Sequence, residues 1–176
     1  MRSRFPLLAG ALLLLVLGTA LSACGSGDGG QETSVQSASP AAIKRANAIC
    51  CQFRREVVAL GRSAASQSAP PTPQLITESL VRPSIPLLKR VSARMQALEA
   101  SADSKSFTLY ANLFDPFIVL TEKRLQAGLE EDQARARGLE EQLTDLSVVQ
   151  RRAARLAGIH ACDVDFPRLL IDSVGG

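Results

Sequence analysis

Residues 39–61 read SPAAIKRANAICCQFRREVVALG, and this stretch decides the fold. Ser39 followed by Pro40 is a helix start signal, and Gly61 predicts the end of that helix. Between them the apolar residues recur at steps of three and four, which predicts an amphipathic helix whose apolar face other elements must cover. The residues of this face are Ile43, Ala46, Cys50, Phe53, Val57 and Leu60.

The same signals recur after a proline-rich loop. Thr72 and Pro73 repeat the cap and first-turn proline, and helical apolar spacing continues from there to Leu98. Pro83 and Pro86 lie inside this second helix, and proline removes a backbone donor and collides with the preceding turn. The sequence therefore predicts a second helix that is kinked or split.

A third helix is expected from Asp103, as its N-cap, to Gly128, interrupted by Pro116. A fourth is expected from Glu130 or Asp132, with Gly158 in a left-handed position at its end. Its predicted apolar face consists of Leu139, Leu143, Leu146, Val149, Ala153 and Leu156.

Four helices with short joins and no convincing strand predict an all-α fold, namely a kinked antiparallel four-helix bundle over residues 40–176. About 137 residues follow Ser39, enough for one domain with a sizeable core. The formal charge of +3 falls to +1 without Arg2 and Arg4, and basic residues are interleaved with acidic ones. This charge pattern argues against a nucleic-acid partner.

The first 24 residues predict export and a lipid anchor. Arg2 and Arg4 precede an apolar run over 7–21 that is short for a membrane-spanning helix, followed by small residues and Cys24. Residues 21–24, LSAC, resemble the lipobox of bacterial lipoproteins, which implies a signal peptide over 1–23 and acyl chains on Cys24. The alternative is an ordinary secretory signal in which Cys24 is incidental.

Residues 24–39 then comprise the attachment point and a flexible linker rich in Gly, Ser, Gln and Thr. We expect the domain to be held by lipid at the extracytoplasmic face of the cell membrane, where more than one acyl chain gives stable anchoring.

Three cysteines remain beyond Cys24, and an exported domain favours disulfides. Cys50 lies on the apolar face of the first helix, whereas Cys51 is turned about 100° away from it. In an up-down-up-down bundle the end of the fourth helix returns near the first, so we expect a bond between Cys50 and Cys162. Closing a loop of this length contributes roughly 4 to 5 kcal/mol in the loop-entropy model. Cys51 either competes for Cys162, pairs between molecules, or stays free.

Two short phrases, ANAIC at 46–50 and AGIHAC at 157–162, resemble the two ends of a set of small helical lipoproteins of high-GC Gram-positive bacteria. The resemblance implies an alanine-rich first helix with one cysteine and a second cysteine after the last helix. Cys51 departs from that pattern.

Aromatic residues concentrate in the third helix. Helical spacing places them on one face, which favours a packed core over the alternative of a pocket for an apolar ligand such as a lipid tail. The candidate pocket residues are Phe107, Tyr110, Phe114 and Phe117.

Enzyme chemistry is not indicated, because no set of nucleophile, base and orienting group is recognisable. A thiolate and imidazole set of Cys50, Cys51, His160 and Cys162 would suit copper or zinc, but no Cys-x-x-Cys spacing is present and a lone loop histidine is usually solvated. We therefore expect no cofactor and no metal. The expected function is a non-enzymatic binding or scaffolding module of the cell envelope with an envelope protein partner; the alternative is a carrier of a small apolar ligand or a metal ion in a bundle pocket.

Overall fold

The computed structural model describes residues 38–66 and 72–175, and all of its regular elements in those ranges are helical. The predicted signal peptide, Cys24 and most of the predicted linker lie outside the described residues. No helix in the described ranges is both long enough and apolar enough to cross a bilayer.

Helix α1 (Pro40–Ala65) begins as predicted. The Ser39 hydroxyl accepts a hydrogen bond from the Ala42 backbone N–H at 3.3 Å, and Pro40 occupies the first turn. The predicted end was wrong, since the helix continues past Gly61 by one turn. Gly61 lies buried inside the helix and does not end it.

The second predicted helix is three consecutive segments, α2 (Pro73–Ile76), the π-helical η1 (Thr77–Val81) and α3 (Arg82–Gln96). Thr72 caps α2 through its side chain, as expected. The π-helical segment ends at Val81, two residues before Pro83, which has no N–H to donate to the preceding turn. Pro86 is accommodated inside α3.

The third predicted helix is also divided, into α4 (Glu99–Ala102), α5 (Lys105–Asn112) and α6 (Phe114–Leu129). Asp103 does not cap it: Asp103 is left-handed with φ of 48°, and Ser104 is the cap of α5. The break falls at Leu113 rather than at Pro116, because a proline at 116 cannot donate to the Asn112 carbonyl and fits instead in the first turn of α6.

Helix α7 (Gln133–Leu156) is capped by Asp132, one of the two predicted starts, and Gly158 follows it with φ of 77°, as predicted. The predicted apolar face is partly wrong, since Val149 and Leu156 are exposed. Beyond Leu143, the buried face of α7 also includes small and polar residues, each one position after a residue of the predicted apolar face. These residues are Ser147, Gln150, Ala154 and Ala157.

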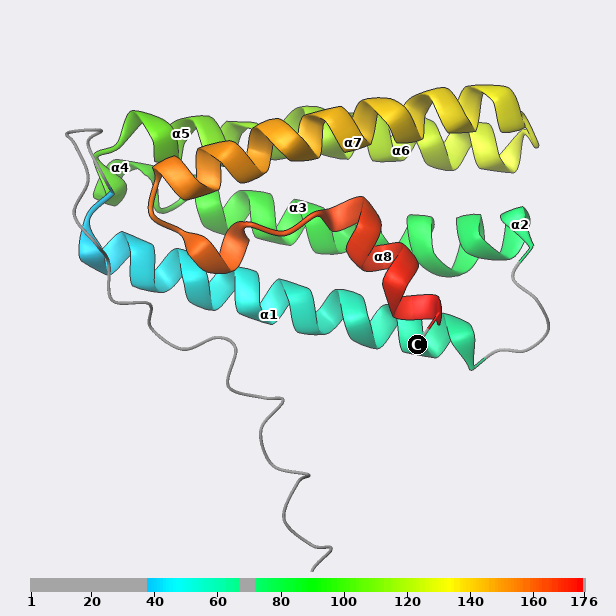
Figure 1. The fold of residues 1–176 in the computed structure, drawn as a ribbon, viewed down its shortest axis with the longest axis horizontal. Helices are drawn as coiled ribbons and strands as arrows, with labels where there is room; N and C mark the ends of the chain where they lie inside the picture. Colours follow the sequence, from blue (N-terminus) through cyan, green and yellow to red (C-terminus); the bar gives the residue numbers. More distant parts are fainter. Residues whose placement is uncertain (1–37, 67–71, 176) are drawn as a thin grey trace, which may run out of the picture.

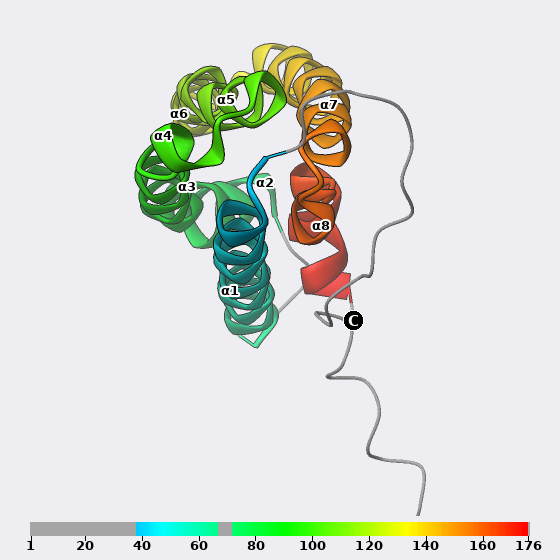
Figure 2. The ribbon, with the colours of Figure 1, turned by 90° about the vertical axis from the view of Figure 1, so that its left-hand side faces the viewer.

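After α7 come the 3-10 turn η2 (His160–Cys162) and a further helix, α8 (Phe166–Gly175), which the sequence analysis did not predict. The α8 helix lies between α1 and α7 in Figure 1 and contacts both. Figure 2 shows α1, α3, α5, α6, α7 and α8 arranged around a shared interior. The all-α fold is confirmed, whereas the count of four helices is not, because α8 is present and α5 and α6 are separate.

Candidate functional site

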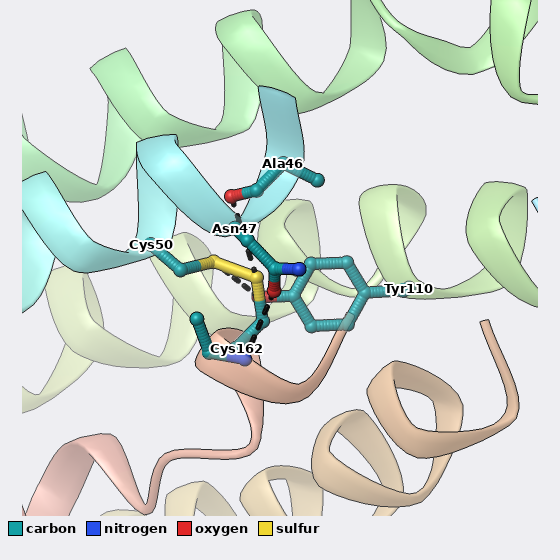
Figure 3. The surroundings of a disulfide bond; sticks show 6 residues. Ala46, Asn47, Cys50, Tyr110 and Cys162 are labelled. Carbon is teal, nitrogen blue, oxygen red and sulfur yellow. Dashed lines mark hydrogen bonds between the residues drawn. A yellow bond between two sulfur atoms is a disulfide. The ribbon is translucent and has the colours of Figure 1, made fainter. Parts of the chain in front are cut away.

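The predicted disulfide between Cys50 and Cys162 is present and joins α1 to η2, with the two Cα atoms 5.2 Å apart (Figure 3). The Tyr110 hydroxyl donates to Cys50 Sγ at 3.6 Å, and the Ala161 backbone N–H donates to Asn47 Oδ1 at 2.9 Å. Burial raises the pKa of Tyr110 because the phenolate would be desolvated. The bond and these contacts fix the chain immediately before α8 onto α1.

The remaining candidate metal ligands do not form a site in the described ranges. Cys50 and Cys162 have no thiolate to offer while they are joined, and His160 is exposed. Cys51 is buried, does not pair with Cys162 and is not free. Between residues 38–66 and 72–175, no cluster of three or more histidine, cysteine or acidic side chains is placed to bind a metal ion.

The four aromatic residues named as a candidate pocket are brought together, and all are packed inside the protein with at most 3% of their surface exposed. Tyr110 and Phe114 meet edge to face at 5.4 Å between ring centroids, and Phe117 meets Phe166 of α8 in the same way at 5.4 Å. The cavity beside them measures only about 20 Å³, enough for about one water molecule. The aromatic residues therefore form core rather than the walls of a binding chamber.

A much larger cleft of about 470 Å³ lies next to this core and was not foreseen from the sequence. Four parts of the chain form its walls: η1 together with the start of α3, the middle of α6, the first half of α7, and the start of α8. Phe117 is the only one of the four predicted pocket residues that lines it. Its other apolar lining residues are Ile76, Leu80, Val81, Leu143, Phe166, Pro167 and Leu170.

The α8 wall of the cleft is held by local contacts. Asp165 caps α8, since its carboxylate accepts from the Arg168 backbone N–H at 3.1 Å. Arg155 pairs with Asp163 at 2.9 Å, and Arg151 lies 3.9 Å from Asp165. These pairs tie the segment before α8 to α7, while the disulfide ties it to α1.

One charged side chain is buried in the cleft wall. Arg124 of α6 is only 10% exposed, and its Nε donates to Glu140 Oε1 on α7 at 2.7 Å. Its Nη1 donates to Thr77 Oγ1 on η1 at 3.3 Å. Because Thr77 Oγ1 in turn donates to the Pro73 carbonyl at 2.9 Å, the π-helical turn is part of the support of the guanidinium.

Close packing at Gly128 allows this arrangement. A Cβ atom at Gly128 would lie 2.7 Å from Thr77 Cγ2 and 2.9 Å from Arg124 Nη1, both shorter than ordinary contacts. Gly128 lies one turn after Arg124 on α6. Only a residue without a side chain at this position leaves room for the pair of Thr77 and Arg124.

The exposed rim of the cleft belongs to one face of α7 and carries charges of both signs, at helical steps of three and four. From the sequence, no functional role was predicted for these rim residues, and the cation at Arg124 on the buried face of its helix was the signal that could have indicated a site. The rim residues are Arg137, Glu140, Glu141, Thr144 and Asp145.

Comparison with known proteins gives this chain no relative: no protein-family model, no curated protein sequence and no solved structure matches it.

Proposed function

We propose that this protein is an exported, lipid-anchored module that binds a small, mainly apolar ligand in the cleft between η1, α6, α7 and α8. The cleft is the observation that carries the proposal. Its volume of about 470 Å³ lies within the range of roughly 300 to 1,000 Å³ common for small-molecule sites. Its mostly apolar lining with a few convergent polar groups is also typical of such sites.

The cleft favours a carrier over a pure scaffold, although the binding site differs from the predicted aromatic pocket. Of the four predicted pocket residues, a ligand in the cleft would contact Phe117, while Phe107, Tyr110 and Phe114 belong to the packed core. The proposal assigns no catalytic step and no cofactor to the chain.

A scaffolding role with an envelope protein partner is the second candidate, and one observation favours it. Several large apolar side chains on α5 and α7, two helices that contact each other, are 42–50% exposed. They are Leu109, Val148, Val149 and Leu156.

The proposed location follows from the N-terminal sequence. Acyl chains on Cys24 hold the protein to the extracytoplasmic face of the cell membrane, and residues 25–39 connect the lipid to the domain. Replacing Cys24 with alanine is expected to abolish acyl labelling and membrane retention. A variant that is still acylated and retained like the wild type contradicts the anchor.

We also propose that the fold derives from an antiparallel four-helix bundle. Its four members are α1, the α2 to α3 segment, the α5 to α6 segment and α7, and α8 is added against α1 and α7. The alternating directions of these segments in Figure 1 support this description.

Native mass spectrometry of the full chain purified from its own host tests the ligand. We expect a small molecule that remains bound to the wild type and is lost from Thr144→Trp, because Thr144 is exposed on the cleft rim and an indole there fills the entrance. Gln142→Trp is the matched control, since Gln142 is exposed on α7 but does not line the cleft. A wild type without bound molecule, or equal loss from both variants, contradicts the proposal.

A further inference from the structure

Arg124 stands out among the polar groups of this protein. Within residues 38–66 and 72–175 it is the only charged side chain that is buried, and the other buried polar side chains are hydroxyls and one amide. Burying a cation is costly unless it is paired and hydrogen-bonded, and an apolar residue would close the wall of an apolar cleft more favourably. Its presence there calls for a reason beyond packing.

The guanidinium has unused donors. Its Nε is bonded to Glu140 and its Nη1 to Thr77, whereas Nη2 makes no hydrogen bond to the part of the chain that the structure describes. Nη2 also retains some accessible surface. In the same part of the chain, the only side-chain nitrogen or oxygen that is both fully enclosed and without a hydrogen-bond partner is Gln150 Nε2. An arginine presents five donors in a rigid fork, so a positioned donor edge remains available to a ligand in the cleft.

Glu140 is a replaceable partner. Its side chain is 54% exposed, so its carboxylate can turn into solvent once another anion pairs with Arg124, which stays fixed by Thr77 and by the packing at Gly128. The pair therefore consists of a fixed, buried cation and an exposed counter-ion that a second anion can replace.

Building on the proposed cleft function, we propose that the ligand is an amphiphile whose apolar chain ends in a carboxylate, and that this carboxylate binds Arg124 in exchange for Glu140. The apolar chain lies against Leu80, Leu143 and Phe166, and the planar carboxylate matches the guanidinium fork.

The charges around the cleft favour a head group with one negative charge over a head group with two. Besides Glu140, the rim residues Glu141 and Asp145 carry two negative charges against the single positive charge of Arg137, so the entrance is negative on balance. A carboxylate brings one negative charge to one buried cation, whereas a phosphate monoester brings about two and meets more repulsion from this rim. The rim charges are exposed and screened by salt. For a head group that reaches Arg124, attraction to the buried guanidinium therefore outweighs repulsion from the rim.

The test compares head groups on one chain length. The full chain is placed in phosphatidylcholine vesicles at mildly alkaline pH and labelled with three photoactivatable probes: a long-chain fatty acid, the corresponding fatty alcohol and the corresponding alkylamine. Labelled peptides are then mapped. We expect the fatty acid to label residues 76–84 and 166–170 at least about tenfold more than the alcohol does, the preference given by one charge-assisted hydrogen bond.

Two variants assign the preference to the buried pair. Arg124→Met keeps a side chain of similar length and is expected to label equally with acid and alcohol. Glu140→Gln is expected to raise labelling by the fatty acid several-fold, because the competing carboxylate is gone. Glu141→Gln is the matched control, since Glu141 is exposed on the same rim whereas Arg124 pairs with Glu140; its effect should be smaller.

The outcomes separate this inference from the proposed function. If acid and alcohol label the cleft equally in the wild type, or the amine labels best, the carboxylate inference is overturned and the apolar site stands. If no probe labels the cleft, both fail. If Arg124→Met does not fold, Glu140→Gln alone decides: unchanged or reduced labelling by the acid refutes the exchange of counter-ions.

Discussion

Replacing Phe114 with alanine tests whether the aromatic face of α5 and α6 is packed core. Phe114 is 3% exposed and lies edge to face against Tyr110 at a centroid distance of 5.4 Å. Its ring also borders the small cavity beside the disulfide. Removal of the ring therefore leaves a hole in the interior rather than a groove open to solvent.

The expected loss is about 3 to 5 kcal/mol in the free energy of unfolding, the range for removing a buried phenyl ring when its surroundings do not collapse. Collapse is restricted here, because Phe117 is held against Phe166 and Tyr110 against the disulfide. A domain of this size has a total stability of about 5 to 15 kcal/mol, so the variant is expected to be folded but close to unfolding.

The assay is urea denaturation followed by circular dichroism, with the disulfide intact. Leu109→Ala is the control, since Leu109 lies on α5 but is 50% exposed and should change the free energy of unfolding by no more than about 0.5 kcal/mol. A loss below about 1 kcal/mol for Phe114→Ala would refute the packed-core interpretation and would return the aromatic face to consideration as a ligand pocket.

Three further changes probe the disulfide, the support of the cleft and the buried phenol. Joint replacement of Cys50 and Cys162 by serine should lower the Tm by roughly 10 °C, since native disulfides typically contribute about 2 to 4 kcal/mol, less than the loop-entropy model gives; an unchanged melting curve would contradict this. Gly128→Ala should cost about 1 to 3 kcal/mol by overpacking, whereas Gly138→Ala, with nothing within 4 Å of the added carbon, should be neutral or stabilising in the same denaturation assay. Burial raises the pKa of Tyr110, so the contribution of its neutral phenol to the free energy of unfolding is present below the unfolded-state pKa of about 10 and is lost as pH rises above it. Tyr110→Phe should therefore reduce the loss of stability at alkaline pH. Identical profiles of unfolding free energy against pH for the variant and the wild type would contradict this.

The sequence predicted the local features of this fold well, because capping is a local interaction. Ser39, Thr72 and Asp132 cap helices where a hydroxyl or carboxylate precedes a helical pattern, and Gly158 is left-handed. The pairing of Cys50 with Cys162 followed from placing the first and last predicted helices side by side.

Helix α8 was missed although its start signal was present. Asp165 is followed by Phe166 and Pro167, the same combination of cap and first-turn proline that marks α1 and α2. The segment was short and lay beyond the last long pattern, so no helical period was available to confirm it. Without α8 one wall of the cleft was missing from the expected fold.

The cleft itself could not be read from the sequence, because it depends on packing between elements far apart in the chain. Thr77, Arg124 and Glu140 come from three segments, and their meeting requires the close approach that Gly128 permits. Similarly, the buried face of α7 follows Ser147 and Gln150 rather than Val149, because its neighbours rather than its own hydrophobicity set its rotation.

The bond between Cys50 and Cys162 encloses every helix from α2 to α7 within one covalent ring of the chain. Hydrolysis of a single peptide bond anywhere inside that ring leaves both fragments attached to each other. A protease that nicks one of the turns between these helices therefore does not release a piece of the domain, and α8 stays connected to α1 through sulfur. Release of a fragment requires two cuts inside the ring, one such cut with reduction of the bond, or a cut outside the ring, so the helices from α2 to α7 tolerate a single nick.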